Sequence, residues 1–328
     1  FSFNCVNQTF PRTTSEMKPE STWTEVVFLQ IMLSSISLLT AALNLFVIIS
    51  VSHFKQLHTP TNTILLSLAV SDFLLGLLLM PAEIIRNTGC WFLDDLMCSL
   101  YNSLSFVITS ASVGDMVLIS VDRYVAICDP LHYPTRVTER KVKIGVCLCW
   151  LFSVVYGCLV VKEDFIKPGR HKFCVGECII TVDFIAGTVD LIVSFVIPVT
   201  IIIVLYMRVF VVAVSQARAM RSHITAVTLQ LSVNIRKKSE LKAARTLGVL
   251  VVVFLICYCP YYCVSLAGED LLNDTYASYS LFLFYLNSTL NPVIYALFYP
   301  WFRKAVRLIV TFQILLPGSC EASVLKNK

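Results

Sequence analysis

The chain has 328 residues, of which 57% are hydrophobic and only 14% are charged, and its mean hydropathy is +0.76. A soluble globular protein of this length does not have such a composition, so lipid must be the solvent for much of the chain. The net charge of +5 is attributed to attraction toward the inner leaflet of a membrane, and no nucleic-acid partner is expected.

Seven segments are apolar over a length that can cross a bilayer, which takes about 20 residues per helix. In chain order these predicted spans are 26–52, 62–82, 99–121, 142–161, 184–212, 246–267 and 279–299. The fold class expected is an all-α membrane protein, a bundle of seven transmembrane helices. Its domains would be an N-terminal segment (1–24), the helical domain (25–299) and a tail (300–328) that starts with a short amphipathic helix on the inner leaflet.

Basic residues in the loops predict the orientation. Lys and Arg gather after spans 1, 3, 5 and 7, and the positive-inside rule assigns such loops to the cytoplasm. The N-terminus would therefore be extracellular, although the loop after span 4 is also basic and departs from the rule. Asn7 begins a glycosylation sequon on that side, and Cys320 in the tail is a candidate for acylation.

Cysteines in the segments predicted to be extracellular are candidates for disulfides, because that compartment is oxidising. They are Cys5, Cys98, Cys174 and Cys178. Four cysteines allow three pairings, and Cys90 is a fifth possible participant. The residues alone leave the pairing open.

The spans contain few charged residues, and a charge at such depth costs enough free energy to suggest a function. Those present are Asp72, Asp115 and Asp190. Prolines remove a helix hydrogen bond and should kink spans 5, 6 and 7, at Pro198, Pro260 and Pro292. The five histidines are dispersed without nucleophile–base or metal-ligand spacing, so we do not expect an enzyme.

Several motifs within the spans occur together and in order. They are Asn44, Asp72, Asp122-Arg123-Tyr124, Trp150, Cys257-Tyr258-Cys259-Pro260 and the segment from Asn291 through Pro292 to Tyr295. This set resembles the signature of the rhodopsin-like G-protein-coupled receptors over nearly the whole chain. Residues 53–62, 120–131 and 296–305 further resemble the trace amine-associated receptors.

The resemblance implies a disulfide pairing. In similar receptors, the second cysteine of a Cys-Val-Gly-x-Cys segment bonds to the top of helix 3 and the first to the N-terminal tail. Cys174-Val175-Gly176-Glu177-Cys178 matches that segment. The pairs implied are Cys98 with Cys178 and Cys5 with Cys174.

The resemblance also implies a switch at the cytoplasmic end. A guanidinium can bridge two carboxylates, so Arg123 is expected to pair with Asp122 and with Glu240 in the resting state. On activation Arg123 would be released toward the G protein while Tyr206 and Tyr295 repack against it. The alternative is that these are ordinary charges pairing at the membrane boundary.

A sodium site is implied around Asp72. Its oxygen ligands would come from Asp72, Ser112, Asn287, Ser288 and Asn291. The alternative is that Asp72 is a buried acid hydrogen-bonded to Asn44 and Asn291. Beyond this possible allosteric ion no cofactor is expected. Asp115, on another face of span 3, is expected to bond at the interface of spans 2 and 4.

The ligand end departs from the usual amine receptor. Such receptors carry the acid that binds the ligand's ammonium seven residues after the cysteine that begins helix 3, and here that residue is Ser105. Asp190 offers a replacement: it lies eight residues before Pro198, or about 12 Å toward the extracellular side. With no Lys or Arg evident at its depth, a bound ammonium is its simplest partner, with a structural hydrogen-bond role as the alternative. The resemblance includes fish receptors that lack the helix 3 acid and keep one on helix 5.

Further ligand-site candidates surround Asp190. They are Thr109, Tyr258, Tyr261, Tyr262 and Tyr285, whose alternative role is ordinary helix packing. Asp183, seven residues before Asp190, or Glu83 at the top of span 2 would give a second acid suited to a diamine. The alternative for Asp183 is a solvated loop residue.

These features predict a plasma-membrane receptor for small amines, of olfactory type, that signals through a stimulatory G protein and cAMP. Its partners would be a small amine, a heterotrimeric G protein and the lipid bilayer. The alternatives are a rhodopsin-like receptor for a non-amine ligand and a transporter. The absence of any visible internal repeat disfavours the transporter.

Overall fold

The computed structural model describes residues 23–88, 91, 93–166, 178, 184–222, 248–264, 274–321 and 324. Helices make up nearly all of these residues, and no strand occurs among them. The elements are α1 (Trp23–His53), η1 (Lys55–Leu57), α2 (Pro60–Leu74), η2 (Leu75–Leu79), α3 (Met80–Thr88), α4 (Asp95–Cys128), α5 (Tyr133–Arg136), α6 (Glu139–Val160), α7 (Lys162–Ile166), α8 (Phe184–Asp190), η3 (Leu191–Val196), α9 (Ile197–Ser222), the helix Gly248–Val264, α11 (Asp274–Phe298), α12 (Pro300–Val310), η5 (Gln313–Leu315) and η6 (Ser319–Glu321).

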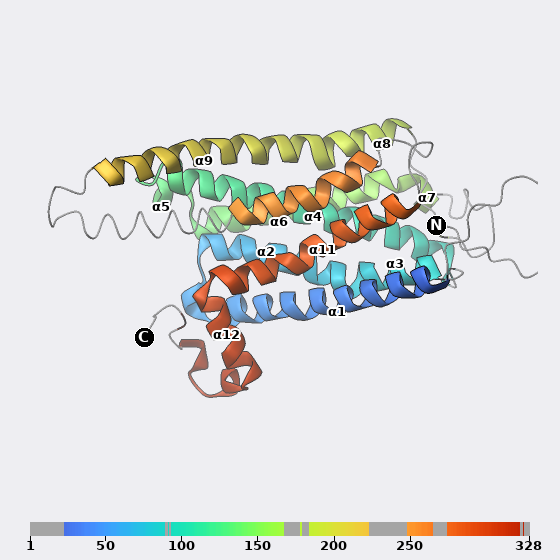
Figure 1. The fold of residues 1–328 in the computed structure, drawn as a ribbon, viewed down its shortest axis with the longest axis horizontal. Helices are drawn as coiled ribbons and strands as arrows, with labels where there is room; N and C mark the ends of the chain where they lie inside the picture. The colour runs from blue at the N-terminus through green and yellow to red at the C-terminus, as the bar shows by residue number, and fades with distance from the viewer. Residues whose placement is uncertain are drawn as a thin grey trace, which may run out of the picture.

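The long helices run side by side, and α12 turns away from them at one end (Figure 1). In the described part of the chain, six helical stretches are long and apolar enough to cross a membrane, and Gly248–Val264 is a shorter apolar helix. The predicted fold class, an all-α bundle of seven membrane helices, is confirmed. The sequence did not predict α7, which follows the fourth long helix.

Two π-helical turns interrupt the long helices, each just before a proline. The turn η2 lies between α2 and α3 and precedes Pro81, and η3 lies between α8 and α9 and precedes Pro198. A proline cannot donate the usual helix hydrogen bond and clashes with the carbonyl four residues earlier, so a wider turn at that point relieves the conflict. The turn η3 directly follows Asp190 and therefore sets the direction in which that residue faces.

Local capping fixes where two of the helices begin. The Thr59 hydroxyl accepts a hydrogen bond from the backbone N–H of Asn62, and Pro60 occupies the first turn of α2. At the other end of the bundle, the Asp94 carboxylate accepts from the backbone N–H of Met97 at 2.9 Å and so starts α4.

The helices pack closely around a buried centre that includes Leu68, Met116, Phe254 and Tyr295. A Cβ atom on Gly157 would lie 2.7 Å from a Val107 methyl, so α6 approaches α4 to a distance that only glycine permits. Large apolar side chains on the outside of α6 and α9 are exposed, as expected of helices solvated by lipid.

Candidate functional site

Asp190, at the end of α8, accepts two hydrogen bonds on one carboxylate oxygen. The Tyr156 hydroxyl of α6 donates to its Oδ1 at 2.6 Å, and the Ser194 hydroxyl, one turn further on, donates at 2.9 Å. Both donors are neutral, and no Lys or Arg in the described ranges forms an ion pair with Asp190. The carboxylate is thus oriented by hydroxyl groups while its charge is left without a counter-ion.

Aromatic rings form a continuous series that starts beside η3, the turn that follows Asp190. Tyr262 stacks on Phe195 with ring centroids 4.5 Å apart and meets Tyr261 edge-on at 5.4 Å. Tyr258 lies 6.4 Å from Tyr262 and 4.4 Å from Phe254, so the series continues into the bundle. Tyr261 and Tyr262 are near enough to Asp190 for an electrostatic interaction.

Ser105 and Thr109, two of the predicted ligand-site residues, lie on α4. The Ser105 hydroxyl donates to the carbonyl of Tyr101 on its own helix at 2.9 Å, so it supplies neither charge nor a free donor in this conformation. Thr109, one turn further along, is half-buried.

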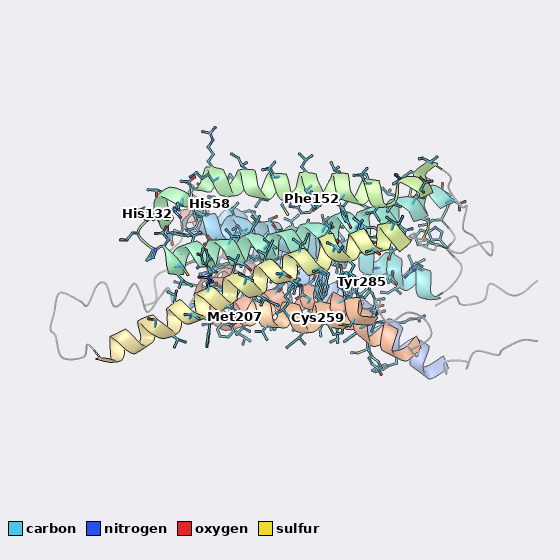
Figure 2. The ribbon with its side chains drawn as sticks, turned by 90° about the horizontal axis from the view of Figure 1, so that it is seen from above. His58, His132, Phe152, Met207, Cys259 and Tyr285 are labelled. Atoms are coloured by element: carbon cyan, nitrogen blue, oxygen red, sulfur yellow. A yellow bond between two sulfur atoms is a disulfide. The ribbon has the colours of Figure 1, made fainter. Side chains whose placement is uncertain are left out.

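Glu83, the candidate second acid, is already paired. Its carboxylate is 3% exposed and binds Arg86 through two hydrogen bonds, from Nη2 at 2.5 Å and from Nε at 3.2 Å. The Tyr101 hydroxyl also donates to it. Tyr285, which Figure 2 labels within the bundle, lies close enough to this group for the charges of Glu83 and Arg86 to act on it.

Arg86, which is the partner of Glu83, was not named in the sequence analysis. The apolar window of span 2 ends before it, whereas the helix continues through α3 to Thr88. A signal was available, because an acid and an arginine three residues apart share a helix face.

A disulfide joins Cys98, at the start of α4, to Cys178, with Cα atoms 5.6 Å apart. This is the pair that the family resemblance implies, and it excludes a bond between Cys98 and Cys90. Other predicted extracellular features lie outside the described residues: Cys5, Asn7, Cys174 and Asp183.

At the end of the bundle that the sequence predicts to be cytoplasmic, Asp122 is held by several donors. It forms an ion pair with Arg123, and it accepts from the Tyr133 hydroxyl at 2.8 Å and from the Thr61 hydroxyl at 2.9 Å. Arg123 Nη2 also donates to Thr61 at 2.6 Å. Burial raises the pKa of Tyr133, which keeps its hydroxyl protonated as a donor.

The sequence did not predict Thr61 and Tyr133 as partners of this motif, and Glu240, which it did predict, lies outside the described residues. Tyr124 packs on the pair of Ile127 and Val209, joining α4 to α9. The hydroxyls of Tyr206 and Tyr295 are buried and have no hydrogen-bond partner among the described residues.

The cluster around Asp72 lies in the middle of the bundle. Asn291 donates to Asp72 Oδ2 at 2.7 Å, as expected, but Asn44 does not bond Asp72. Instead, its amide donates at 3.0 Å to the carbonyl of Thr40, one turn earlier on α1, and at 3.0 Å to the carbonyl of Ser288 on α11, so both of its N–H groups are engaged by the backbone.

Several buried oxygens of this cluster have no partner among the described residues. They are Asn44 Oδ1, Asp72 Oδ1, Ser112 Oγ, Asn287 Oδ1 and Asn291 Oδ1. Leaving a buried polar atom unsatisfied costs free energy, so such a group of oxygens needs water or an ion. One acid among neutral hard oxygens fits a hydrated monovalent cation.

Asp115 has the partners that the sequence analysis expected at the interface of spans 2 and 4. The Ser67 hydroxyl of α2 donates to its Oδ2 at 2.7 Å, and the Trp150 indole of α6 donates to Ser67 at 2.9 Å. This acid joins three helices through Oδ2, as a structural role requires, while its Oδ1 is buried without a hydrogen-bond partner among the described residues.

Comparison with known proteins places these features together. The model of the family described as 7 transmembrane receptor (rhodopsin family) matches residues 43–295. The chain is 37% identical to trace amine-associated receptor 13c of Danio rerio, over 99% of this chain and 96% of that one. It is 35% identical to trace amine-associated receptor 1 of Mus musculus, over 89% and 91%, and 37% identical to trace amine-associated receptor 5 of Rattus norvegicus, over 88% and 86%.

Proposed function

Because the chain belongs to the trace amine-associated receptors, within the rhodopsin family of seven-transmembrane receptors, we propose that it detects small amines by pairing their ammonium group with Asp190. Membership makes the chain a multi-pass membrane receptor, not an enzyme, with a small-molecule ligand and a G protein as partners. The observation that carries the amine proposal is the Asp190 carboxylate, which has hydroxyl donors but no counter-ion among the described residues.

The free-energy argument rests on charge. A carboxylate removed from bulk water is costly unless a cation pairs with it. The two hydroxyl donors hold Oδ1 and leave Oδ2 for a ligand. An ammonium bound there would also meet the faces of Tyr261 and Tyr262, where cation–π attraction adds to the ion pair.

The aromatic series suggests how binding is passed inward. A ligand that moves Tyr262 acts on Phe195 of η3 and on Tyr258, which packs in turn against Phe254. This route joins the Asp190 region to the Gly248–Val264 helix, whose Pro260 is the predicted hinge.

The finer parts of the proposal concern the remaining predicted residues. A sodium ion would balance the negative charge of Asp72. Its oxygen ligands would come from Asp72, Ser112, Asn287, Ser288 and Asn291. Glu240 would share Arg123 with Asp122 in the resting receptor, and the G protein would be of the stimulatory class, acting through cAMP. The chain would reside in the plasma membrane of olfactory cells with its N-terminal segment (1–24) outside and its tail (300–328) inside. Cys5–Cys174 pairing, Asn7 glycosylation and Cys320 acylation complete this arrangement.

The test is a cAMP assay against a panel of small amines, comparing wild type with Asp190→Asn. The substitution keeps the shape of the side chain and removes its charge, so amine potency should fall by about 100-fold or more, as expected when one partner of a desolvated charge pair is removed. Glu163→Gln is the matched control, because it removes a charge from an exposed position on α7.

A normal amine response from Asp190→Asn would contradict the site assignment. The second candidate, a receptor for a non-amine ligand, is favoured by Ser105, which supplies no charge where amine receptors carry an acid. It would be supported if no amine in the panel raised cAMP while a neutral ligand did so.

A further inference from the structure

Besides Asp190, the described residues at the extracellular end include a second acid that is buried, Glu83. Arg86 grips it with two guanidinium nitrogens, one on each carboxylate oxygen, in the forked geometry that gives the strongest protein ion pairs. Tyr101 donates a further hydrogen bond to Oε2. The charge of Glu83 is therefore cancelled within the chain.

A series of aromatic rings runs from the turn that follows Asp190 toward the Glu83–Arg86 pair. Phe195 of that turn stacks on Tyr262, which meets Tyr261 edge-on at 5.4 Å. Tyr261 lies 5.0 Å from Phe284, and Phe284 lies 5.7 Å from Tyr285, which is near enough to Glu83 and Arg86 for an electrostatic interaction. A ligand whose ammonium lies at Asp190 and whose body crosses Tyr261 would thus extend toward the Glu83–Arg86 pair.

The charge of the site follows from these three residues. Asp190 and Glu83 are negative and Arg86 is positive, so one negative charge remains, and one ammonium balances it. A second ammonium at the far end of a ligand would meet the guanidinium of Arg86 and a carboxylate whose oxygens are already engaged. Such a group would lose its hydration without gaining a partner.

We propose that Arg86 is a specificity-determining residue that neutralises Glu83 and makes the receptor select monoamines over diamines. This inference rests on the proposed role of Asp190, to which it adds the nature of the ligand's other end. Removing the positive charge would convert the site to two acids and hence to a site for diamines.

The experiment measures cAMP responses to linear monoamines and α,ω-diamines of matched chain length. Wild type should respond to monoamines at lower concentrations than to diamines. In Arg86→Gln the ratio of diamine to monoamine potency should rise by about tenfold or more, since a freed carboxylate gains an ion pair with the second ammonium. Arg86→Lys, which keeps the charge, should retain the wild-type ratio.

A charge-neutral double variant separates charge from packing. Glu83→Gln with Arg86→Gln removes both charges, and it should keep the monoamine preference because one negative charge, at Asp190, still remains. A diamine gain in this double variant equal to that of Arg86→Gln would overturn the proposal.

Cell-surface labelling of each variant guards against loss of folding. If Arg86→Gln does not reach the surface, Glu83→Gln decides: its freed Arg86 should depress diamine potency further and raise the potency of amines that carry a terminal carboxylate. Unchanged potency ratios in Glu83→Gln would contradict the proposal. A wild-type preference for diamines would also contradict it and would make Asp183 the candidate for the second acid.

The role of Asp190 in amine binding is tested independently of the role of Arg86. Asp190→Asn measured in the same series should lose both ligand classes. If monoamine responses survive that substitution, the Asp190 assignment is wrong, whereas a lost response together with an unchanged ratio in Arg86→Gln removes only the role of Arg86.

Discussion

The two ends of the bundle treat an aspartate in opposite ways. At the cytoplasmic end, Asp122 is paired with Arg123 and receives hydrogen bonds from Thr61 and Tyr133. At the extracellular end, Asp190 receives two hydroxyl donors and no cation from the described residues. In Figure 2 these ends are far apart, with His58 and His132 marking the cytoplasmic one.

The difference separates two uses of a charge. A carboxylate balanced within the chain stabilises one conformation, and function follows when the balance is broken. A carboxylate left unbalanced can instead be completed by something that arrives from outside. Removing the charge should therefore have opposite consequences at the two ends.

The largest effect is expected from Asp122→Asn set beside Asp190→Asn. Asp122→Asn releases Arg123 from a buried ion pair whose disruption costs about 3–5 kcal/mol, so signalling without ligand should rise severalfold. Asp190→Asn should instead lower amine potency by about 100-fold or more and leave the unliganded signal unchanged. Unliganded and amine-stimulated cAMP at equal surface expression measures both.

Asp129→Asn is the control for the cytoplasmic substitution. Asp129 lies just beyond α4 and pairs with His132 and Arg136, away from Arg123. The proposed difference between Asp122 and Asp190 would be contradicted if Asp122→Asn lowered amine potency without raising the unliganded signal.

The next expected effect is that of sodium at Asp72, an acid that is neither paired with a cation, as Asp122 is, nor near the ligand site, as Asp190 is. One of its oxygens is paired with Asn291 and the other has no partner among the described residues, so an ion would complete it. Replacing sodium by potassium at constant ionic strength should change amine potency by about tenfold in wild type, a coupling of ordinary size. The sodium effect should be absent in Asp72→Asn.

Asp115→Asn is its control, because Asp115 is equally buried but is bonded to Ser67 of α2 and not to Asn291. A sodium effect that persists in Asp72→Asn would argue that the unpaired oxygens hold water instead.

The seven-helix fold could be predicted from the sequence because lipid requires long apolar segments, and the hydropathy of a segment depends on its own residues alone. Side-chain pairing across helices could not. Arg86 was missed because it lies beyond the apolar window, and Tyr156 because nothing local relates a tyrosine on one helix to an acid on another. The direction of the Asn44 amide was wrong for the same reason.

The cytoplasmic motif shows the same limit. Arg123 and Asp122 are adjacent, so their pairing could be anticipated, while Thr61 and Tyr133 reach them only through the packing of α2 and the turn before α6. The absence of an acid at Ser105 was informative because it is a local fact. The hydroxyl donors that position Asp190 instead are a property of the fold.

An effect of similar size is expected from the donors around Asp190. Ser194→Ala and Tyr156→Phe each remove one hydroxyl that orients the carboxylate, worth about 1.5 kcal/mol for a hydrogen bond to a charged group. Amine potency should fall by about tenfold in each. Neither substitution should add to the loss in Asp190→Asn, because the donors act through that charge.

Ser153→Ala is the matched control on α6, since its hydroxyl donates to the backbone of Cys149 and not toward the ligand site. If Ser194→Ala lowered potency equally in the presence and absence of the Asp190 charge, its role would be packing.

The smallest effect is expected where an acid and a base meet in open solvent. Lys55 and Glu321 pair at 3.2 Å between η1 and the tail, with side chains 65% and 72% exposed. Water solvates both groups nearly as well apart as together, so Glu321→Gln should leave the unliganded signal, the amine potency and the melting temperature of the purified receptor within experimental error. A measurable change would mean that this tail contact, unlike other exposed ion pairs, is coupled to the buried Asp122–Arg123 pair. In that case an exposed charge pair, and not only a buried one, would bias the receptor's conformation.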